Sequence, residues 1–353
     1  MAQAEVEAKL ADRADVALQR ARRAALLRSG GALVALLVVV VIVDYLTHGD
    51  FLTAGNITNV LRQITYNTIL AVGQTFVIIT AGIDLSVGSL VALAGVVCAL
   101  FANAVPLHGD LLLVATLVIA LALGAFAGFV NAVPVVKLGL PPFITTLAMM
   151  QIARGFAYIF SSGRPVALSD NAGNAFANTG IGYVLSGLLA PLRLPGIPIA
   201  VIWMAIVVVV FAVLLSRTRF GRYVYAIGGN EEAARLAGVS VGLVKTAVYM
   251  ISGALAAVGG MLLMARFSSG SPQTGTGFEL NAIAAVVVGG TSLMGGRGTV
   301  VGTFFGALLI GVLNNVMNLI GIESYTQQIV LGVVIVTAVI IDELRKRYLA
   351  ARR

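Results

Sequence analysis

The chain has 353 residues, of which 59% are hydrophobic and only 11% are charged, and its mean hydropathy is +0.99. This composition excludes an ordinary soluble domain and predicts an all-α, polytopic membrane protein. The net charge of +8 does not indicate a nucleic-acid partner, because the Lys and Arg residues are spread between apolar runs and gather on no single soluble face.

The rarer residue types narrow the possibilities further. Forty glycines in so apolar a chain indicate helices that approach one another closely. Cys98 is the only cysteine, which excludes an intramolecular disulfide. The two histidines, His48 and His108, have no second ligand at helical spacing. We therefore expect no metal site and no cofactor.

The two ends of the chain are basic. Residues 1–28 form a tail that we expect in the cytoplasm, where it sets topology or contacts anionic membrane lipid. The apolar run that follows has no short hydrophobic region with a small-residue cleavage site, so it predicts a retained first span and not a signal peptide. We expect a membrane domain over residues 29–345 and a second basic tail over residues 346–353.

Runs of roughly 17 to 25 apolar residues, each long enough to cross about 30 Å of hydrocarbon, occur about ten times. The predicted spans are 29–47, 62–81, 85–104, 110–136, 142–162, 196–216, 243–265, 279–293, 299–321 and 325–342. Two segments with repeated glycines, AGIDLSVGSLVAL and GGTSLMGGRGTVVGTFFGAL, indicate broken or re-entrant helices between spans.

The basic residues predict the orientation of these spans. An even number of spans places both termini on one side. If that side is the cytoplasm, 18 of the 23 Lys and Arg residues fall inside, four fall outside, and Arg154 lies within a span. The positive-inside rule therefore predicts that the N-terminus and the C-terminus are both cytoplasmic.

Two long connections follow from this orientation. Residues 163–195 are rich in Gly, Asn, Ser and Pro and are predicted to lie outside. Residues 217–242 are predicted to lie inside and to contain a short helix. Asn230 can cap that helix, Glu231 and Glu232 would occupy its first turn, and Gly238 can end it.

Residues for catalysis are not evident. The chain has no G-x-x-x-x-G-K-[ST] phosphate-binding loop, and no nucleophile and histidine pair, zinc ligand set or twin carboxylates in its apolar segments. We therefore expect a non-catalytic membrane subunit whose energy comes from a separate protein. The predicted helix in 217–242 is either a solvated surface turn or an element that fits a groove on such a partner.

Several long segments carry a specific resemblance. They are GRYVYAIGGN with the residues after it, AGIDLSVGSLVAL, FITTLAMMQIARG, ARFSSGSPQTGTGFELNAIAAVVVGGTSLMGGRGTVVGTFFGAL and IGVLNNVMNLIG. Over about residues 31 to 345 the chain resembles bacterial ABC importer permeases of the ribose and simple-sugar type. The resemblance implies a multi-pass protein of the bacterial inner membrane that forms a homodimer, with a cytoplasmic ABC ATPase subunit and a periplasmic sugar-binding protein as partners.

The resemblance also assigns a role to the predicted cytoplasmic helix. Contact with the ATPase is expected at Gly229, Asn230, Glu231, Glu232, Ala233, Ala234, Arg235 and Gly238. The segment lacks the Ile-x-Leu-Pro ending that other importers place further on, which agrees with the ribose-type branch.

Polar residues within the spans are candidates for the substrate path. They are Asn67, Gln74, Asp84, Ser86, Asn314 and Asn318. A sugar path needs scattered amides and hydroxyls that bind weakly enough for release. Each of these residues could instead serve structure, since amides form hydrogen bonds between helices and Asp84 can cap the helix that follows it. Arg154 is expected to meet backbone carbonyls or to extend toward the interface.

On the predicted outer loop, Arg164 and Arg193 are candidates for docking acidic residues of the binding protein. The function expected from the sequence is import of ribose or a related monosaccharide by alternating access. The alternatives are a permease for a branched-chain amino acid, a nucleoside or a signalling molecule, an ion-coupled transporter that uses Asp84, and a membrane scaffold that transports nothing.

Overall fold

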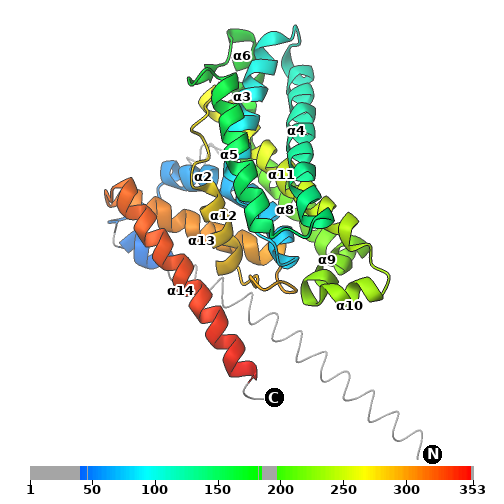
Figure 1. The fold of residues 1–353 in the computed structure, drawn as a ribbon. Coiled ribbons are helices and arrows are strands. Elements are labelled where there is room, and N and C mark those ends of the chain that lie inside the picture. Colours follow the sequence, from blue (N-terminus) through cyan, green and yellow to red (C-terminus); the bar gives the residue numbers. More distant parts are fainter. Residues whose placement is uncertain (1–39, 46, 182, 185–196, 351–353) are drawn as a thin grey trace, which may run out of the picture. The chain divides into compact units, whose positions relative to one another are not determined.

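A computed structural model describes residues 40–45, 47–181, 183–184 and 197–350 (Figure 1). The chain divides into two compact units, Met1–Leu52 and Thr53–Arg353. In the first unit, residues 40–45 are helical and end in a turn. Two hydrogen bonds fix this turn, because the Thr47 hydroxyl donates to the Val43 carbonyl at 2.9 Å and the Leu52 amide donates to Asp44 Oδ1 at 3.0 Å.

The second unit is built of helices, as expected for an all-α fold. The elements are α2 (Ala54–Ile79), α3 (Val87–Ala104), α4 (Gly109–Lys137), α5 (Pro142–Phe160), β1 (Val166–Ala167), α6 (Asp170–Ile181), β2 (Tyr183–Val184), β3 (Ile197–Pro198), α8 (Ile199–Arg217), α9 (Arg219–Gly229), α10 (Glu231–Leu236), α11 (Val241–Phe267), β4 (Ser269–Gly270), α12 (Phe278–Val288), α13 (Val300–Leu319) and α14 (Ser324–Ala350). The four strands have two residues each and form two antiparallel pairs, β1 with β4 and β2 with β3.

Within the described part of the chain, six helices are long and apolar enough to cross a membrane. They are α3, α4, α5, α8, α11 and α13, and they coincide with predicted spans. The chain is therefore a polytopic membrane protein. The count of about ten spans and the cytoplasmic position of both termini stay predictions. The basic tail 1–28 lies outside the described residues.

Helix α2 occupies a predicted span but is not one of the six apolar helices, because it carries several polar residues. Nineteen of its 26 residues are buried, and it packs against α11, α13, α12 and α8. Neighbouring helices thus shelter polar groups that lipid could not solvate. A polar helix is stable here because it forms the core of the bundle.

Helix α12 corresponds to the predicted span 279–293 but is too short to cross alone. Its 11 residues would extend roughly 16 Å at 1.5 Å per residue, about half the hydrocarbon thickness. The non-helical residues before it run along α3, since Gly270 packs against Gly95 and Gly275 packs against Gly88. This crossing is therefore a broken segment, although its break at 268–277 lies outside the two glycine-rich segments in which the sequence predicted breaks.

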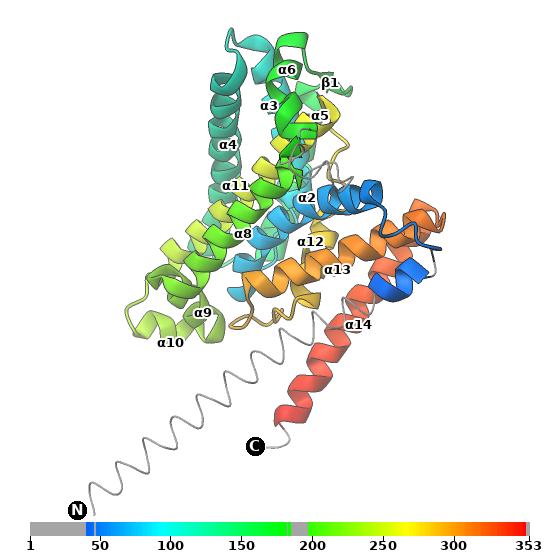
Figure 2. The ribbon, with the colours of Figure 1, turned by 180° about the vertical axis from the view of Figure 1, so that it is seen from behind.

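Three of the predicted outer connections, those after α3, α5 and α11, meet at one end of the second unit. Strand β1, after α5, pairs with β4, after α11. Asn103 at the end of α3 donates to the Ala167 carbonyl and accepts from the Ser169 amide, both at 2.8 Å. Helices α9 and α10 lie at the opposite end, as Figures 1 and 2 show from two sides. The alternation of loops between two ends agrees with the predicted order of these spans.

The contact between α4 and α11 depends on glycine. Gly124 and Gly128 on α4 meet Gly253 and the Tyr249 backbone on α11 so closely that a Cβ at any of the three glycines would overlap backbone atoms of the facing helix. Small residues allow such approach in membranes, where packing and not a hydrophobic driving force joins helices.

We predict that Gly253→Leu destabilises the protein by about 1–3 kcal/mol, because the added side chain has no space against the Gly124 carbonyl. Thermal unfolding in detergent measures the effect as a lower Tm. The matched control is Gly332→Leu on α14, where a Cβ would meet no atom within 4 Å. Equal Tm values for the two variants would contradict the prediction.

Candidate transport and coupling sites

A buried carboxylate lies in the break between α2 and α3. Asp84 is fully buried, and its Oδ1 accepts hydrogen bonds from the Ser86 amide at 3.0 Å and the Ser86 hydroxyl at 2.6 Å. Its Oδ2 accepts from the Ser252 hydroxyl of α11 at 2.8 Å. A carboxylate away from water needs such donors, because burying an unpaired charge is costly.

Three further helices fix the same break. In the amide orientation that satisfies both groups, Gln74 of α2 donates to the Asp84 carbonyl at 3.2 Å and accepts from the Asp84 amide at 3.1 Å. Asn131 of α4 donates to the Ser86 hydroxyl at 3.0 Å. The Thr146 hydroxyl of α5 lies 3.1 Å from the Ile83 carbonyl. With Ser252, these contacts join α2, α4, α5 and α11 around one loop.

The network shows where three of the predicted path residues lie. Gln74, Asp84 and Ser86 come together, fully buried, and bond to one another or to the loop backbone. Asp84 binds the amide of Ser86, the N-cap residue of α3, and Ser86 itself makes no side-chain cap hydrogen bond. Asn67 is also buried, on the same helix as Gln74. Contact of these residues with substrate stays a prediction.

The remaining two predicted path residues lie on α13. Asn314 is half-buried, and Asn318 is exposed and accepts from the Gln327 amide at 2.8 Å. Their neighbour Asn315, which no sequence pattern singled out, is buried and exchanges two hydrogen bonds with Asn56 of α2, at 2.9 and 2.8 Å. An asparagine pair between helices so distant in sequence leaves no local signal.

At the end of the second unit occupied by α9 and α10, α10 has the predicted cap. The Asn230 side chain accepts from the Ala233 amide at 2.9 Å, and the chain leaves the helix through Gly238, whose φ of +81° favours glycine. Glu231 forms ion pairs with Lys245 of α11 and with Arg235, the latter at 3.1 Å. These contacts attach the short helix to the start of a membrane-spanning one.

The neighbouring positive charges of Lys245 and Arg235 keep the carboxyl group of Glu231 ionised. Partial burial acts to raise the pKa of its carboxyl, but the hydrogen bonds and positive charges of Lys245 and Arg235 outweigh it and hold the pKa below the ordinary value. The ion pairs therefore contribute to stability at pH values above the ordinary pKa of Glu. That contribution is lost only as the pH falls through the lowered pKa of Glu231. Glu231 is ionised at neutral pH.

Helix α9 contacts the bundle through backbone. Gly228 packs so closely on the Ile79 carbonyl of α2 that a Cβ there would overlap it, and the Gly296 amide donates to the same carbonyl at 2.9 Å. The Tyr225 hydroxyl donates to the Gly298 carbonyl at 2.6 Å, and burial raises its pKa, which keeps the proton in place. Helix α9 thus joins the end of α2 to the loop before α13.

Comparison with known proteins assigns the chain to a family. Residues 56–339 match the model of the branched-chain amino acid transport system / permease component family. The chain belongs to this permease family. It is 45% identical to a ribose import permease protein of Haemophilus influenzae and 46% identical to that of Escherichia coli K12, each over 88% of this chain and 92% of the relative. A fructose import permease protein of Rhizobium meliloti is 34% identical over 88% of this chain and 84% of the relative. No solved structure was found to match.

The α9–α10 segment of this permease carries an exposed surface suited to a partner. Leu236, at the end of α10, is 82% exposed, and Glu232 is exposed beside it. Of the predicted coupling residues, Gly229 ends α9 and those from Asn230 to Gly238 lie on α10 or at its ends. Their contact with an ATPase stays a prediction.

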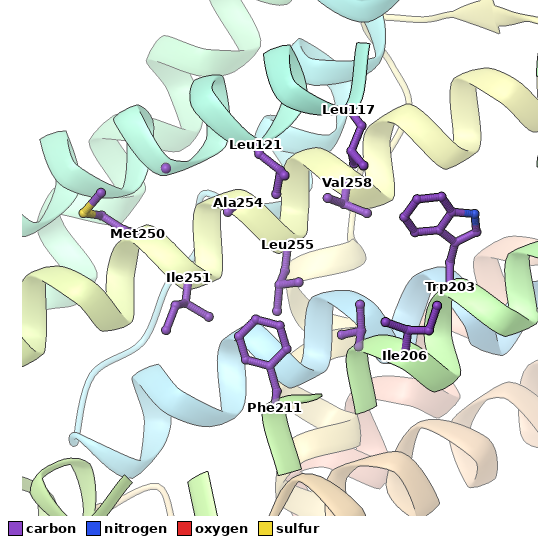
Figure 3. A pocket seen from close by; sticks show the side chains of 12 residues that line it. Leu117, Leu121, Trp203, Ile206, Phe211, Met250, Ile251, Ala254, Leu255 and Val258 are labelled. Carbon is purple, nitrogen blue, oxygen red and sulfur yellow. The ribbon is translucent and has the colours of Figure 1, made fainter. Parts of the chain in front are cut away.

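The permease also has an apolar groove of about 370 Å³ between α4, α8 and α11. Figure 3 shows side chains of the three helices pointing into it, among them Leu121, Phe211 and Leu255. The lining includes no polar side chain except the indole of Trp203. The groove does not fit a sugar, which needs several hydrogen-bonding groups, and its composition suits lipid-facing surface.

The predicted docking residues lie on the connection after α5. Arg164 is exposed there, which leaves it accessible to a partner. Arg193 lies outside the described residues. A docking role for either stays a prediction.

We predict that Ser252→Ala lowers the free energy of unfolding by about 1–3 kcal/mol, because it leaves Asp84 Oδ2 without its donor. Thr246→Ala on the same helix is the matched control, since its hydroxyl bonds only to the Gly242 carbonyl one turn earlier. Tm values in detergent report the difference. If both variants have the Tm of the wild type, the network does not have the stabilising role assigned to it.

Proposed function

We propose that this chain is the membrane-spanning subunit of an ATP-driven importer for ribose or a related monosaccharide in the bacterial inner membrane. Two copies, two cytoplasmic ATPase subunits and a periplasmic sugar-binding protein would form the complete importer. The family, and the 43–46% identity to ribose import permeases over most of the chain, support this assignment.

The observation that carries the proposal is the construction of the α9–α10 segment. It is exposed on one side, and on the other it contacts three parts of the bundle through Glu231–Lys245, Gly228–Ile79 and Tyr225–Gly298. A solvated turn needs no such attachments. An element that passes movement from a partner to the helices needs them, because rigid contacts transmit displacement and flexible ones absorb it.

The route of that movement can be followed along the chain. A displacement of α10 reaches α11 through Lys245 and reaches the end of α2 through Gly228. Five residues beyond Ile79 is Asp84, whose carboxylate is bonded to Ser252 of α11. The same two helices are thus joined at the coupling end and at the buried network, so we propose that they tilt together during alternating access.

An ion-coupled transporter that uses Asp84 is the second candidate from the sequence. The three hydrogen bonds that the carboxylate accepts, and its complete burial, favour a structural role over an ion site open to solvent. Uptake in reconstituted vesicles separates the two functions. The importer requires ATP and the ATPase subunit, whereas the ion-coupled transporter would work without ATP and stop when the ion gradient is abolished.

We predict that Glu232→Lys weakens association with the ATPase subunit and lowers sugar uptake by about tenfold, because it reverses a charge on the exposed side of α10. Co-purification and uptake with the binding protein measure the two effects. The matched control is Glu323→Lys before α14, an exposed position outside the α9–α10 segment. Normal co-purification and uptake by Glu232→Lys would refute the contact.

We predict that Gly228→Val uncouples ATP hydrolysis from transport. The new side chain would separate α9 from the Ile79 carbonyl while leaving the exposed side of α10 unchanged. Sugar uptake should fall by about tenfold or more with the ATPase subunit still bound. Gly173→Val on α6, where a Cβ meets nothing within 4 Å, is the control. Parallel loss of ATPase binding and uptake would show a folding defect and contradict the relay.

A further inference from the structure

A polar side chain lies on the outer face of α5, halfway along a membrane-spanning helix. Gln151 is the tenth of 19 residues, so about 14 Å of helix lies on either side of it. The buried side of α5 consists of Thr145, Thr146, Met149, Ala153 and Ala157, and Gln151 is exposed. Among the described residues no hydrogen bond to its amide is present.

The surroundings of Gln151 are open. Ala148 and Gly155, about one turn away on either side, are also exposed, and a Cβ at Gly155 would meet nothing within 4 Å. Helix α8 exposes Ile202, Val209 and Val213, which is the composition expected against lipid. Helix α5 also exposes large apolar side chains, among them Leu147, Ile152 and Phe156, so Gln151 is an amide within a largely apolar exposed surface.

A second exposed amide lies near the first. Arg154, one turn along α5, donates from Nη1 to the Pro272 carbonyl at 2.6 Å and to the Thr274 carbonyl at 2.9 Å. Gln273 stands between these two residues, and its side chain is exposed. Arg154 therefore fixes the backbone that carries Gln273 beside the middle of α5.

The depth of Gln273 in the membrane can be inferred from the contacts that its neighbours make with α3. Gly270 packs against Gly95, in the middle of that 18-residue helix, and Gly275 packs against Gly88 near its start. Gln273 lies between these levels, well below the end of α3 that meets β1. Both amides are thus at membrane depth, where an amide without a hydrogen-bonding partner costs several kcal/mol, about 2–7 kcal/mol by transfer measurements.

We propose that Gln151 and Gln273, together termed the amide face, line the route of the sugar through the two-copy importer proposed above. Amides donate and accept hydrogen bonds without charge, which suits the hydroxyls of a neutral sugar. Water fills the route when sugar is absent. The inference rests on the proposed import function and adds residues to it.

The described part of one chain leaves the amide face uncovered. Helix α5 packs mainly on α3 and α4, and α14 packs on α12 and α13, so neither covers the other. Figure 1 shows α5 and α14 on opposite sides of α12. The described part of one chain therefore provides one wall, and a symmetric partner would present the same residues across the route.

Single-cysteine variants test this in membrane vesicles that contain the complete importer. Cys98→Ala removes the only native cysteine, which is buried. Gln151→Cys or Gln273→Cys is then introduced, with Val209→Cys on the 62% exposed lipid side of α8 as the control. Thiols react with hydrophilic maleimides only where water allows the thiolate to form, so labelling at 151 and 273 should be about tenfold faster than at 209. Equal rates would overturn the route.

The same variants test the second wall. A bifunctional maleimide should join two chains of Gln151→Cys into a species of twice the mass and should not do so for Val209→Cys. Rapid labelling of Gln151→Cys without cross-linking by reagents of any length would overturn the paired wall. Neither readout requires a sugar, so both remain informative if the transported solute is of another class.

Uptake then tests the contact with sugar. Gln151→Leu should lower ribose uptake by about tenfold while the ATPase subunit stays bound, since the route loses a hydrogen-bonding group at its centre. Gln151→Asn should restore part of it, and Val209→Leu should transport normally. Normal uptake by Gln151→Leu would overturn the contact with sugar. If wild-type vesicles import another solute and not ribose, the proposed substrate fails while labelling and cross-linking still decide the route.

Discussion

A carboxylate inside a membrane-spanning bundle is stable only if the protein supplies the hydrogen bonds that water would otherwise provide, and the centre of this structure depends on that constraint. Asp84 receives its donors from Ser86 and from Ser252 of α11. Separating α11 from the loop between α2 and α3 would leave a buried charge without part of its solvation. The network therefore holds helices distant in sequence at a fixed mutual position.

The same constraint explains why α2 is the core helix although it is more polar than its neighbours. Several of its polar side chains have partners on other helices, as in the pairs Asn56–Asn315 and Thr75–Thr303, the latter 2.7 Å apart. Lipid offers no such partners. The apolar helices, in contrast, expose large hydrophobic side chains, for example Val118 on α4 and Ile206 on α8. The most polar of these helices therefore lies inside, where its polar groups can find partners, while large apolar side chains on α4 and α8 suit contact with lipid.

Hydropathy predicted the apolar crossings well because long apolar runs have a direct physical meaning. The cap at Asn230 was also predictable, since a cap depends on residues three positions apart. Partners such as Asn131 and Ser252 were not, because no local pattern tells which of many polar residues will face Asp84. Similarly, residues 279–293 form one apolar run in the sequence. The structure shows that the helix there, α12, has only 11 residues and packs on α2 and α13.

Arg154 and Gln151 show how one turn of a membrane helix can separate two roles. Arg154 points toward the segment 271–277 and bonds to two of its carbonyls, which satisfies part of its guanidinium within the chain. Gln151 is exposed and has no bond among the described residues, although both side chains lie at similar depth. An unsatisfied amide there is stable only if something outside one chain solvates it. For a permease, the available solvents are water in a route and the surface of a second copy, and a sugar route between two copies supplies both.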